Sequence, residues 1–219
     1  MGQEIDLLAN YPRTKRNVEE RGQSKTEADR ALARQFGQAF FDGDRSHGYG
    51  GFSYNPRFWT PVIPTFRDHF DLKAGDRVLD VGCAKGFMMH DMAAAIPGLV
   101  VKGVDVSDYA IANAMDDMRG HVQVANAVSL PFADKSFDVV ISINTIHNLV
   151  EADCARALKE IERVAIRGAF ITVDAYFDED QRQRMEAWNL TARTIMHGET
   201  WKAFFDQIGY TGDYFWFIP

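Results

Sequence analysis

The sequence predicts an α/β protein with a doubly wound, mostly parallel sheet. Short apolar, β-branched runs recur from Arg77 onward, helical patterns separate them, and a glycine-containing turn follows the first run. Continuous apolar strands that alternate with helices are typical of a parallel sheet covered on both faces. Right-handed crossovers between such strands give the doubly wound form.

The elements of this domain are predicted in chain order. The apolar runs indicate strands at residues 77–81, 99–106, 121–125, 137–143 and 169–176. Helical patterns lie between or after them, at residues 85–96, 107–118, 153–164, 178–190 and 200–208. One more strand fits after Gly209, and the chain leaves no room for an antiparallel pair there. We therefore expect either an abbreviated edge or one completed by a partner chain, such as a second copy in a homodimer.

The N-terminal part has a different character, so we divide the chain into a cap at residues 1–70 and the α/β domain at residues 71–219. Residues 24–41, "SKTEADRALARQFGQAFF", have the pattern of one amphipathic helix. Ser24 or Thr26 is suited to cap its first turn.

A glycine- and aromatic-rich loop follows at residues 44–54. Its glycines are suited to act as hinges, and Tyr49, Phe52 and Tyr54 are suited to close over a bound ligand. The alternative is that these aromatic side chains only pack the cap onto the core.

Composition narrows the class of protein. The 219 residues carry a formal net charge of −7, which does not favour nucleic-acid binding, and we expect no DNA partner. No apolar run reaches the roughly 18 residues that a membrane span needs. The first residues lack a basic-then-apolar signal pattern, and the two cysteines give no disulfide framework. These features favour a cytoplasmic protein.

The turn after the first strand is the strongest functional signal, because ligands of doubly wound sheets bind at the carboxyl ends of the strands. Its fixed positions are Asp80, Gly82 and Gly86. A phosphate-binding loop would continue with Lys after its last glycine, but Phe87 stands there. A dinucleotide turn would need glycines where Ala84 and Phe87 stand. Both of these nucleotide sites are therefore disfavoured.

The remaining pattern, D-x-G-x-x-x-G, resembles the first motif of class I S-adenosylmethionine-dependent methyltransferases. The segments "VKGVDVSDY", "VANAVSLPFADKSFDVV" and "ALKEIERVAIRGAFITVD" resemble later motifs of the same family, in the same order. The resemblance covers about residues 76–175. It implies a Rossmann-like methyltransferase fold, S-adenosylmethionine as cofactor and S-adenosylhomocysteine as its product.

The resemblance also implies roles for individual residues. Asp80 lies on the side of the cofactor's ammonium, and N–H groups at the start of the next helix suit its carboxylate. Asp105 would accept hydrogen bonds from both ribose hydroxyls. Asn126 stands where the family usually has Asp, and its amide oxygen can accept from the adenine amino group. The implied cofactor-binding set is Asp80, Gly82, Ala84, Gly86, Asp105, Val106, Asn126, Ala127, Val128 and Asn144. For the two valines, packing at strand ends is the alternative.

The acceptor is less defined than the cofactor. A DNA amino-methyltransferase would have prolines and an aromatic residue after Asn144, where this chain has "TIHN". A cytosine C5 enzyme would use a cysteine after proline, and neither cysteine follows one. The six histidines show no metal-ligand spacing. These observations favour a metal-free enzyme that acts on a small molecule.

Three residues are candidates for the chemistry. His147 follows the fourth predicted strand and could act as a base or orient the acceptor, while Asp174 and Tyr176 follow the fifth. The alternatives are a helix-capping role for His147 and a strand-end hydrogen bond for Asp174. A basic cluster in the cap favours an anionic acceptor, with a solvated charge run as the alternative; it consists of Arg13, Lys15, Arg16 and Arg21.

Three other functions remain open at this point. The acceptor could be a macromolecule, either RNA or protein. The domain could bind the cofactor without turnover. A nicotinamide-dependent oxidoreductase is a further alternative, which the missing glycines disfavour.

Overall fold

In the computed structural model, residues 2–13, 18 and 25–219 are described, and their centre is a parallel sheet. Its strands run in the order β3-β2-β1-β4-β5, and β7 pairs with the other edge of β5. The short strand β6 pairs with the last two residues of β5. The bounds are β1 (Arg77–Val81), β2 (Val100–Asp105), β3 (Val122–Val124), β4 (Phe137–Ile143), β5 (Ala165–Tyr176), β6 (Met196–His197) and β7 (Asp213–Phe217). The predicted doubly wound, mostly parallel sheet is confirmed.

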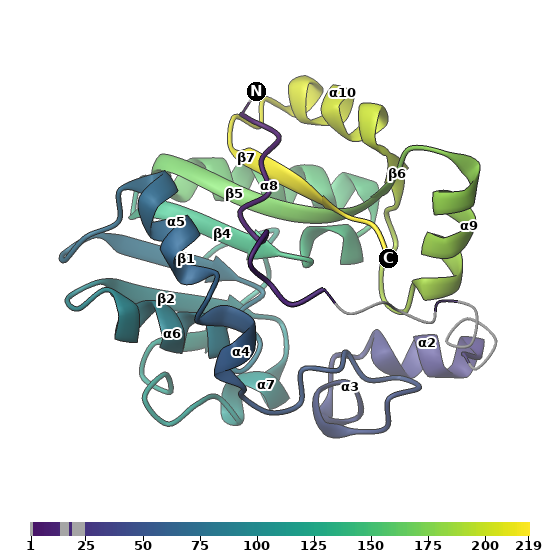
Figure 1. Ribbon diagram of the computed structural model, residues 1–219, viewed down its shortest axis with the longest axis horizontal. Helices are drawn as coiled ribbons and strands as arrows, with labels where there is room; N and C mark the ends of the chain where they lie inside the picture. Colours follow the sequence, from purple (N-terminus) through teal and green to yellow (C-terminus); the bar gives the residue numbers. More distant parts are fainter. Residues whose placement is uncertain (1, 14–17, 19–24) are drawn as a thin grey trace.

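Helices cover both faces of this sheet (Figure 1). On one face, α8 (Glu151–Val164) and α10 (Gly198–Ile208) pack into an apolar core with Leu79, Val140 and Ile171. On the other face, α5 (Ile63–Phe70) and α6 (Phe87–Ala95) form a second core with Val78 and Ile141. Alternate residues of β1 therefore belong to different cores, as a strand buried on both faces requires.

Smaller helices lie around the carboxyl ends of the strands. They are α2 (Glu27–Ala33), α3 (Gln38–Asp42), α4 (Pro56–Trp59), α7 (Asp108–Ala112), α9 (Glu179–Trp188) and the 3₁₀ turn η1 (Ile146–Asn148). Figure 1 shows α2, α3 and α9 beyond the ends of the strands, with α9 beside β6. No helix in the described part of the chain is long and apolar enough to cross a membrane.

The prediction of one helix over residues 24–41 is wrong, because the helical conformation is interrupted between α2 and α3. Phe36 adopts a left-handed conformation with φ of 49°, and Gly37 is extended at the start of α3. Thr26 caps α2 in a reciprocal capping box with Asp29. Ser24, the other predicted cap, lies outside the described residues.

The predicted helix at residues 107–118 is also too long, since α7 ends at Ala112. Beyond Asn113 the backbone leaves the helix, and the N–H of Met115 donates to the carbonyl of Lys85 at 3.0 Å. This bond keeps Met118 next to the turn after β1. The Cβ and Cγ atoms of Met118 lie within 3.2 Å of the position that a Cβ atom at Gly86 would take. Tertiary contact with the turn has overridden the local helical pattern.

At the other edge of the sheet, the final strand is single and parallel to β5. Its second edge is bonded to the chain's own N-terminal segment: Ile5 donates to the carbonyl of Tyr214, and Tyr214 donates to the carbonyl of Gln3, each at 3.0 Å. The outer edge of the final strand is thus paired, at Tyr214, with the N-terminal segment of the same chain. Whether a second copy binds elsewhere stays a prediction.

Candidate cofactor and acceptor site

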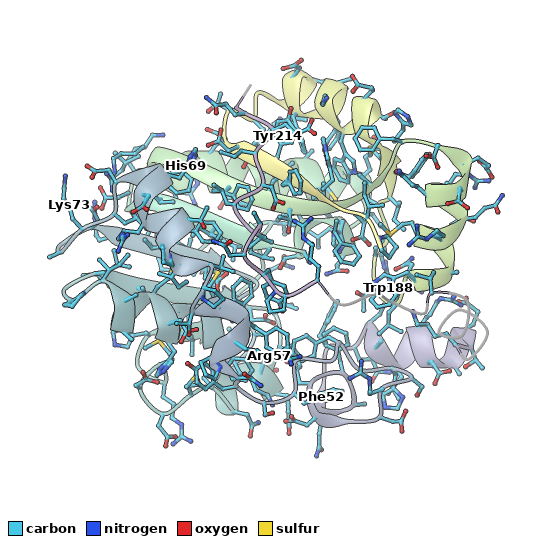
Figure 2. All side chains as sticks on the ribbon, viewed as in Figure 1. Phe52, Arg57, His69, Lys73, Trp188 and Tyr214 are labelled. Carbon is cyan, nitrogen blue, oxygen red and sulfur yellow. The ribbon has the colours of Figure 1, made fainter. Side chains whose placement is uncertain are left out.

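A cavity of about 1370 Å³ opens at the carboxyl ends of the strands. It is lined by α3 and α4 of the cap, by the ends of β1, β2, β4, β5 and β7, and by residues 188–192. Lys25, just before α2, donates to the carbonyl of Trp188 at the end of α9, so the cap meets the C-terminal part of the chain across the cavity. Figure 2 shows Trp188 on this side of the molecule and Arg57 on α4.

The turn after β1 is held in a conformation that requires glycine. Gly82 has φ of 89° and Gly86, which starts α6, has φ of 80°. A Cβ atom at Gly82 would lie 2.0 Å from Oγ1 of Thr145. Ala84 also has a positive φ, 49°, where the methyltransferase family usually has glycine. The turn therefore passes close to the loop that follows β4.

Two carboxylates flank this turn. Asp80 at the end of β1 is 5% exposed, and Asp105 at the end of β2 is partly buried. The Asp105 oxygens accept N–H groups from Ala84 and Ser107, each at 2.9 Å, so this carboxylate ties the turn to β2. Burial, and secondarily the charge of Asp105, raises the pKa of Asp80 to about 8. Burial also raises the pKa of Asp105, against the lowering effect of its backbone hydrogen bonds. A cationic ligand would relieve the cost of these two charges.

The remaining predicted cofactor residues divide into two groups. Val106, Asn126, Ala127 and Asn144 line the cavity, and Val106 is 53% exposed. Gly86 and Val128 do not line it. The Asn126 side-chain oxygen accepts the N–H of Val128 at 3.1 Å, so the loop is shaped by the residue proposed to read the adenine.

His147 and Asp174, two of the candidates for the chemistry, lie together in the wall of the cavity. Nδ1 of His147 accepts the backbone N–H of Asp174 at 2.9 Å, and the same nitrogen lies 3.6 Å from Oδ1 of Asp174. Burial lowers the pKa of His147 to about 3, so the ring is neutral. Tyr176 lies outside the cavity wall, where its ring packs edge-on against His197.

The predicted lid residues take different positions. Tyr49 lines the cavity, stacks on Phe40 with ring centroids 5.4 Å apart, and donates to the carbonyl of Gly51. Burial raises the pKa of Tyr49 well above its usual value. Phe52 and Tyr54 do not line the cavity. The hydroxyl of Tyr54 donates to Asp91 on α6 at 2.6 Å, so this residue fastens the cap to the domain.

An ion pair between the buried Lys85 and the exposed Asp42, which the sequence did not indicate, joins the cap to the turn. Nζ of Lys85 lies 2.5 Å from Oδ1 of Asp42 and donates to the carbonyl of Phe52 at 2.9 Å. Tyr109 on α7 donates to the other oxygen of Asp42 at 2.8 Å. The cap is therefore bonded to the turn on which the predicted cofactor site is built.

Of the predicted basic cluster, only Arg13 is described, and it pairs with Asp6 beside the cavity. Lys15, Arg16 and Arg21 lie outside the described residues. Sequence reasoning missed Arg34, Thr145, Asn148 and Trp216, which all line the cavity. Nothing in their local sequence marks them, because the fold alone brings them together. No group of His, Cys, Asp or Glu suited to a metal ion occurs among the described residues.

The mostly parallel sheet with helices on both faces has the Rossmann-like methyltransferase fold that the sequence predicts. Comparison with protein families agrees, because residues 79–173 match the methyltransferase domain family. The matched segment runs from β1 into β5 and contains Asp80, Gly82, Gly86 and Asp105.

Among related proteins, the 27-O-demethylrifamycin SV methyltransferase of Amycolatopsis mediterranei is 35% identical over 47% of this chain and 41% of its own length. The tRNA (carboxymethyluridine(34)-5-O)-methyltransferase of Arabidopsis thaliana is 30% identical over 55% of this chain and 28% of its own. The solved structure of the cyclase SpnF shares the fold, with a TM-score of 0.55 and 22% identity over 77% of this chain and 62% of its own. The chain spans about half the length of the first curated relatives it matches.

Proposed function

We propose that this protein transfers a methyl group from S-adenosylmethionine to a small-molecule acceptor by direct displacement. The observation that carries the proposal is the pair of carboxylates, the buried Asp80 and the partly buried Asp105, on either side of a turn that admits only glycine at position 82. When bound, S-adenosylmethionine supplies a methyl group activated by a positively charged sulfonium.

In this proposal, the chain's own residues bind and orient the two reactants. Asp80 neutralises the ammonium of the cofactor, Asp105 accepts from the ribose hydroxyls, and Asn126 accepts from the adenine amino group. N–H groups at the start of α6 are suited to the cofactor's carboxylate. His147 lies in η1, past the end of β4, and Asp174 lies near the carboxyl end of β5, where the acceptor would approach.

In this proposal His147 and Asp174 have different roles toward the acceptor's proton. Because Nδ1 of His147 already accepts a hydrogen bond, its neutral ring carries the proton on Nε2. His147 is then a donor that orients an acceptor oxygen. Asp174, whose carboxylate lies beside it, is the candidate base for a hydroxyl or ammonium acceptor.

The cap supports this proposal by covering the cavity. The Lys85–Asp42 pair connects the cap to the cofactor turn and Tyr49 of the cap lines the cavity, so cofactor binding and closure of the cap would be coupled. Hydrogen exchange in residues 44–54 should slow when S-adenosylhomocysteine is added, more than in residues 156–164 of α8. Equally slow exchange in the free protein would show that the cap is static.

The experiment that tests the function is transfer of a labelled methyl group. Purified protein and methyl-labelled S-adenosylmethionine are incubated separately with a small-molecule extract, with tRNA and with total protein. Label should enter the small-molecule fraction, and Asp105→Asn should abolish most of it. Label in RNA would favour the activity named for the Arabidopsis relative, although the net charge of −7 speaks against RNA. Cofactor binding without any label would favour a non-catalytic module.

A further inference from the structure

Asn144, the first residue after β4, is held by a single residue of the neighbouring strand. The hydroxyl of Thr172 on β5 donates to Oδ1 of Asn144 at 2.8 Å, and the hydroxyl oxygen accepts the backbone N–H of Asn144 at 2.9 Å. Thr172 is 1% exposed, and Asn144 has a left-handed backbone with φ of 52°. The backbone and the side chain of Asn144 are therefore both fixed from β5.

This arrangement determines which end of the Asn144 amide faces the cavity. Thr172 has one hydroxyl proton, and Oδ1 of Asn144 accepts it. With the amide reversed, Nδ2 would donate to a hydroxyl oxygen that already accepts an N–H. The buried hydroxyl proton would then have no acceptor among the described residues, which is costly. The NH2 group of Asn144 therefore points away from Thr172.

The NH2 group is the polar group that Asn144 offers to a ligand. Asn144 is exposed and lines the cavity. Its carbonyl accepts from Asn148 at 3.3 Å, its N–H and Oδ1 are bonded to Thr172, and Nδ2 donates to no residue in the described part of the chain. Because Oδ1 faces the buried Thr172, the accessible side of the amide is the nitrogen side, where a bound molecule can accept from it.

Asn144 lies between the cofactor turn and the candidate base. Strand β4 pairs with β1 on one side and with β5 on the other. The next residue, Thr145, lies against the turn, because its Oγ1 is 2.0 Å from where a Cβ atom at Gly82 would stand. Thr172 and Asp174 project from the same face of β5, since alternate residues of a strand share a face. The NH2 group is thus placed where the proposed cofactor and acceptor positions meet.

A hydrogen-bond donor at this place distinguishes an oxygen acceptor from a nitrogen acceptor. A neutral amine has one lone pair, which must attack the methyl carbon, so the amine cannot accept a hydrogen bond at the same time. A hydroxyl oxygen has two lone pairs, so it can accept from Asn144 with one and attack with the other. The N–H at Nε2 of His147, in the wall of the same cavity, suits an oxygen for the same reason.

We propose that the acceptor is a hydroxyl compound, whose oxygen receives the methyl group while it accepts a hydrogen bond from the Asn144 amide. This inference rests on the proposed methyl transfer and names its acceptor class. The oxygen–methyl bond forms as the sulfur–methyl bond breaks, the electron pair of the broken bond stays on sulfur, and Asp174 takes the hydroxyl proton. Thr172 is a positioning residue in this scheme, because it acts only through Asn144.

The identity of the methylated atom is the first test. The full chain is incubated with a small-molecule extract and with S-adenosylmethionine that carries an isotopically labelled methyl carbon. The NMR chemical shift of this carbon in the product distinguishes a methyl group on oxygen from one on nitrogen or carbon. We expect an oxygen–methyl bond. A methyl group on nitrogen or carbon would overturn this inference and leave the proposed methyl transfer intact, whereas label in no product would overturn both.

Asn144→Asp removes the donor and keeps the bond to Thr172. The variant still offers an oxygen to the Thr172 hydroxyl, but a second oxygen replaces the NH2 group. Labelled product should form about fivefold more slowly or less, because the acceptor oxygen loses one hydrogen bond. Asn55→Asp is the matched control: Asn55 also lines the cavity, on another element, and aspartate keeps its cap on α4. This control should leave the rate nearly unchanged, and an unchanged rate in Asn144→Asp would overturn the inference.

A second pair of variants tests the role of Thr172. Thr172→Val removes the hydroxyl and keeps the shape of the side chain, so the Asn144 amide is free to turn. Product formation should fall about fivefold or more, while the affinity for S-adenosylhomocysteine stays constant. Thr172→Ser restores the hydroxyl and should restore most of the rate, which a purely structural role of Thr172 does not require. Equal rates in the two variants would show that Thr172 does not position the amide.

The carboxylate of the cofactor is the other oxygen group that the Asn144 amide could bind, and binding measurements separate the two. 5′-Methylthioadenosine lacks the amino-acid part of S-adenosylhomocysteine. If Asn144→Asp weakens S-adenosylhomocysteine about tenfold or more and leaves 5′-methylthioadenosine unchanged, the amide binds the cofactor and the inference is wrong. The inference expects that neither compound binds more weakly to the variant than to the unaltered protein.

Discussion

The backbone N–H of Asp174 donates to Nδ1 of His147, with 2.9 Å between the two nitrogens. This bond joins the loop after β4 to the end of β5 and leaves the imidazole one protonated nitrogen, Nε2. His147, which the sequence presents as a candidate base, therefore faces the cavity as a hydrogen-bond donor through Nε2.

His147 should therefore stay neutral throughout the working pH range. Burial lowers the pKa of its ring to about 3, so the stability that it contributes is present above the ordinary value of 6.5 and is lost as the pH falls toward 3. Nitrogen-detected NMR should show the Nε2–H tautomer from about pH 5 to about pH 8. A His147 titration near pH 6.5 would contradict the assigned tautomer and restore the role of general base.

Asp105 should dominate the affinity for the cofactor. Hydrogen bonds to charged groups contribute about 1.5–3 kcal/mol each, so Asp105→Asn should weaken S-adenosylhomocysteine at least tenfold. Because the carboxylate also holds the N–H groups of Ala84 and Ser107, a modest loss of melting temperature is expected as well. Asp108→Asn, an exposed change three residues along the chain, is the control and should alter neither quantity. Unchanged affinity in a folded Asp105→Asn variant would reduce Asp105 to a structural residue.

Asp80 should make the ligand-free protein less stable as the pH rises. A carboxyl whose pKa is raised by folding, here from 3.8 to about 8, contributes stability that is present below its ordinary pKa and lost as the pH rises through the higher value. Asp80→Asn should therefore raise the melting temperature relative to the unaltered protein at about pH 9 and have a clearly smaller effect at about pH 5.

The same variant should bind S-adenosylhomocysteine less tightly, since it lacks the charge that pairs with the ammonium. Because the two proteins differ only at residue 80, the difference between their melting temperatures reports on Asp80 and not on other titrating groups. If the variant and the unaltered protein have the same melting temperature at each of the two pH values, Asp80 is ionised and well solvated in the free protein.

Gly82→Ala tests the close approach of the turn to Thr145. Gly75 is a matched control, because it has the same φ of 89° and none of the described atoms lies within 4 Å of where its Cβ would stand. A left-handed alanine costs about 1–2 kcal/mol at either position. Gly82→Ala should cost clearly more in denaturant unfolding and should also impair cofactor binding. Equal costs for the two variants would mean that the turn moves away from Thr145 without penalty.

The strand-end residues could be predicted because their positions follow from local patterns. An apolar run ends at Asp80 or Asp105, and parallel strands bring those ends to one edge of the sheet. The cap could not be predicted in the same way. Phe36 does not mark a break in a helical pattern, and the turn between α2 and α3 is fixed by contacts such as the bond from Ser107 to the Phe36 carbonyl at 2.5 Å.

The acceptor side depends even more on tertiary structure. Thr172 fixes the amide of Asn144 from 28 residues further along the chain, and no spacing relates the two residues. The proton position on His147 depends on a backbone group of Asp174, which side-chain identity cannot reveal. Strand β7 likewise pairs in parallel with β5 on one side and bridges to the N-terminal segment at Tyr214 on the other, and the local sequence indicates neither contact.

The central claim is that the turn at Asp80, Gly82 and Asp105 binds S-adenosylmethionine. Calorimetric titration of the purified protein with S-adenosylhomocysteine, NAD and ATP under one set of conditions tests it most directly. We predict binding of S-adenosylhomocysteine in the micromolar range, at one site per chain, with far weaker binding of NAD and ATP. NAD binding as tight as or tighter than that of S-adenosylhomocysteine would contradict this claim.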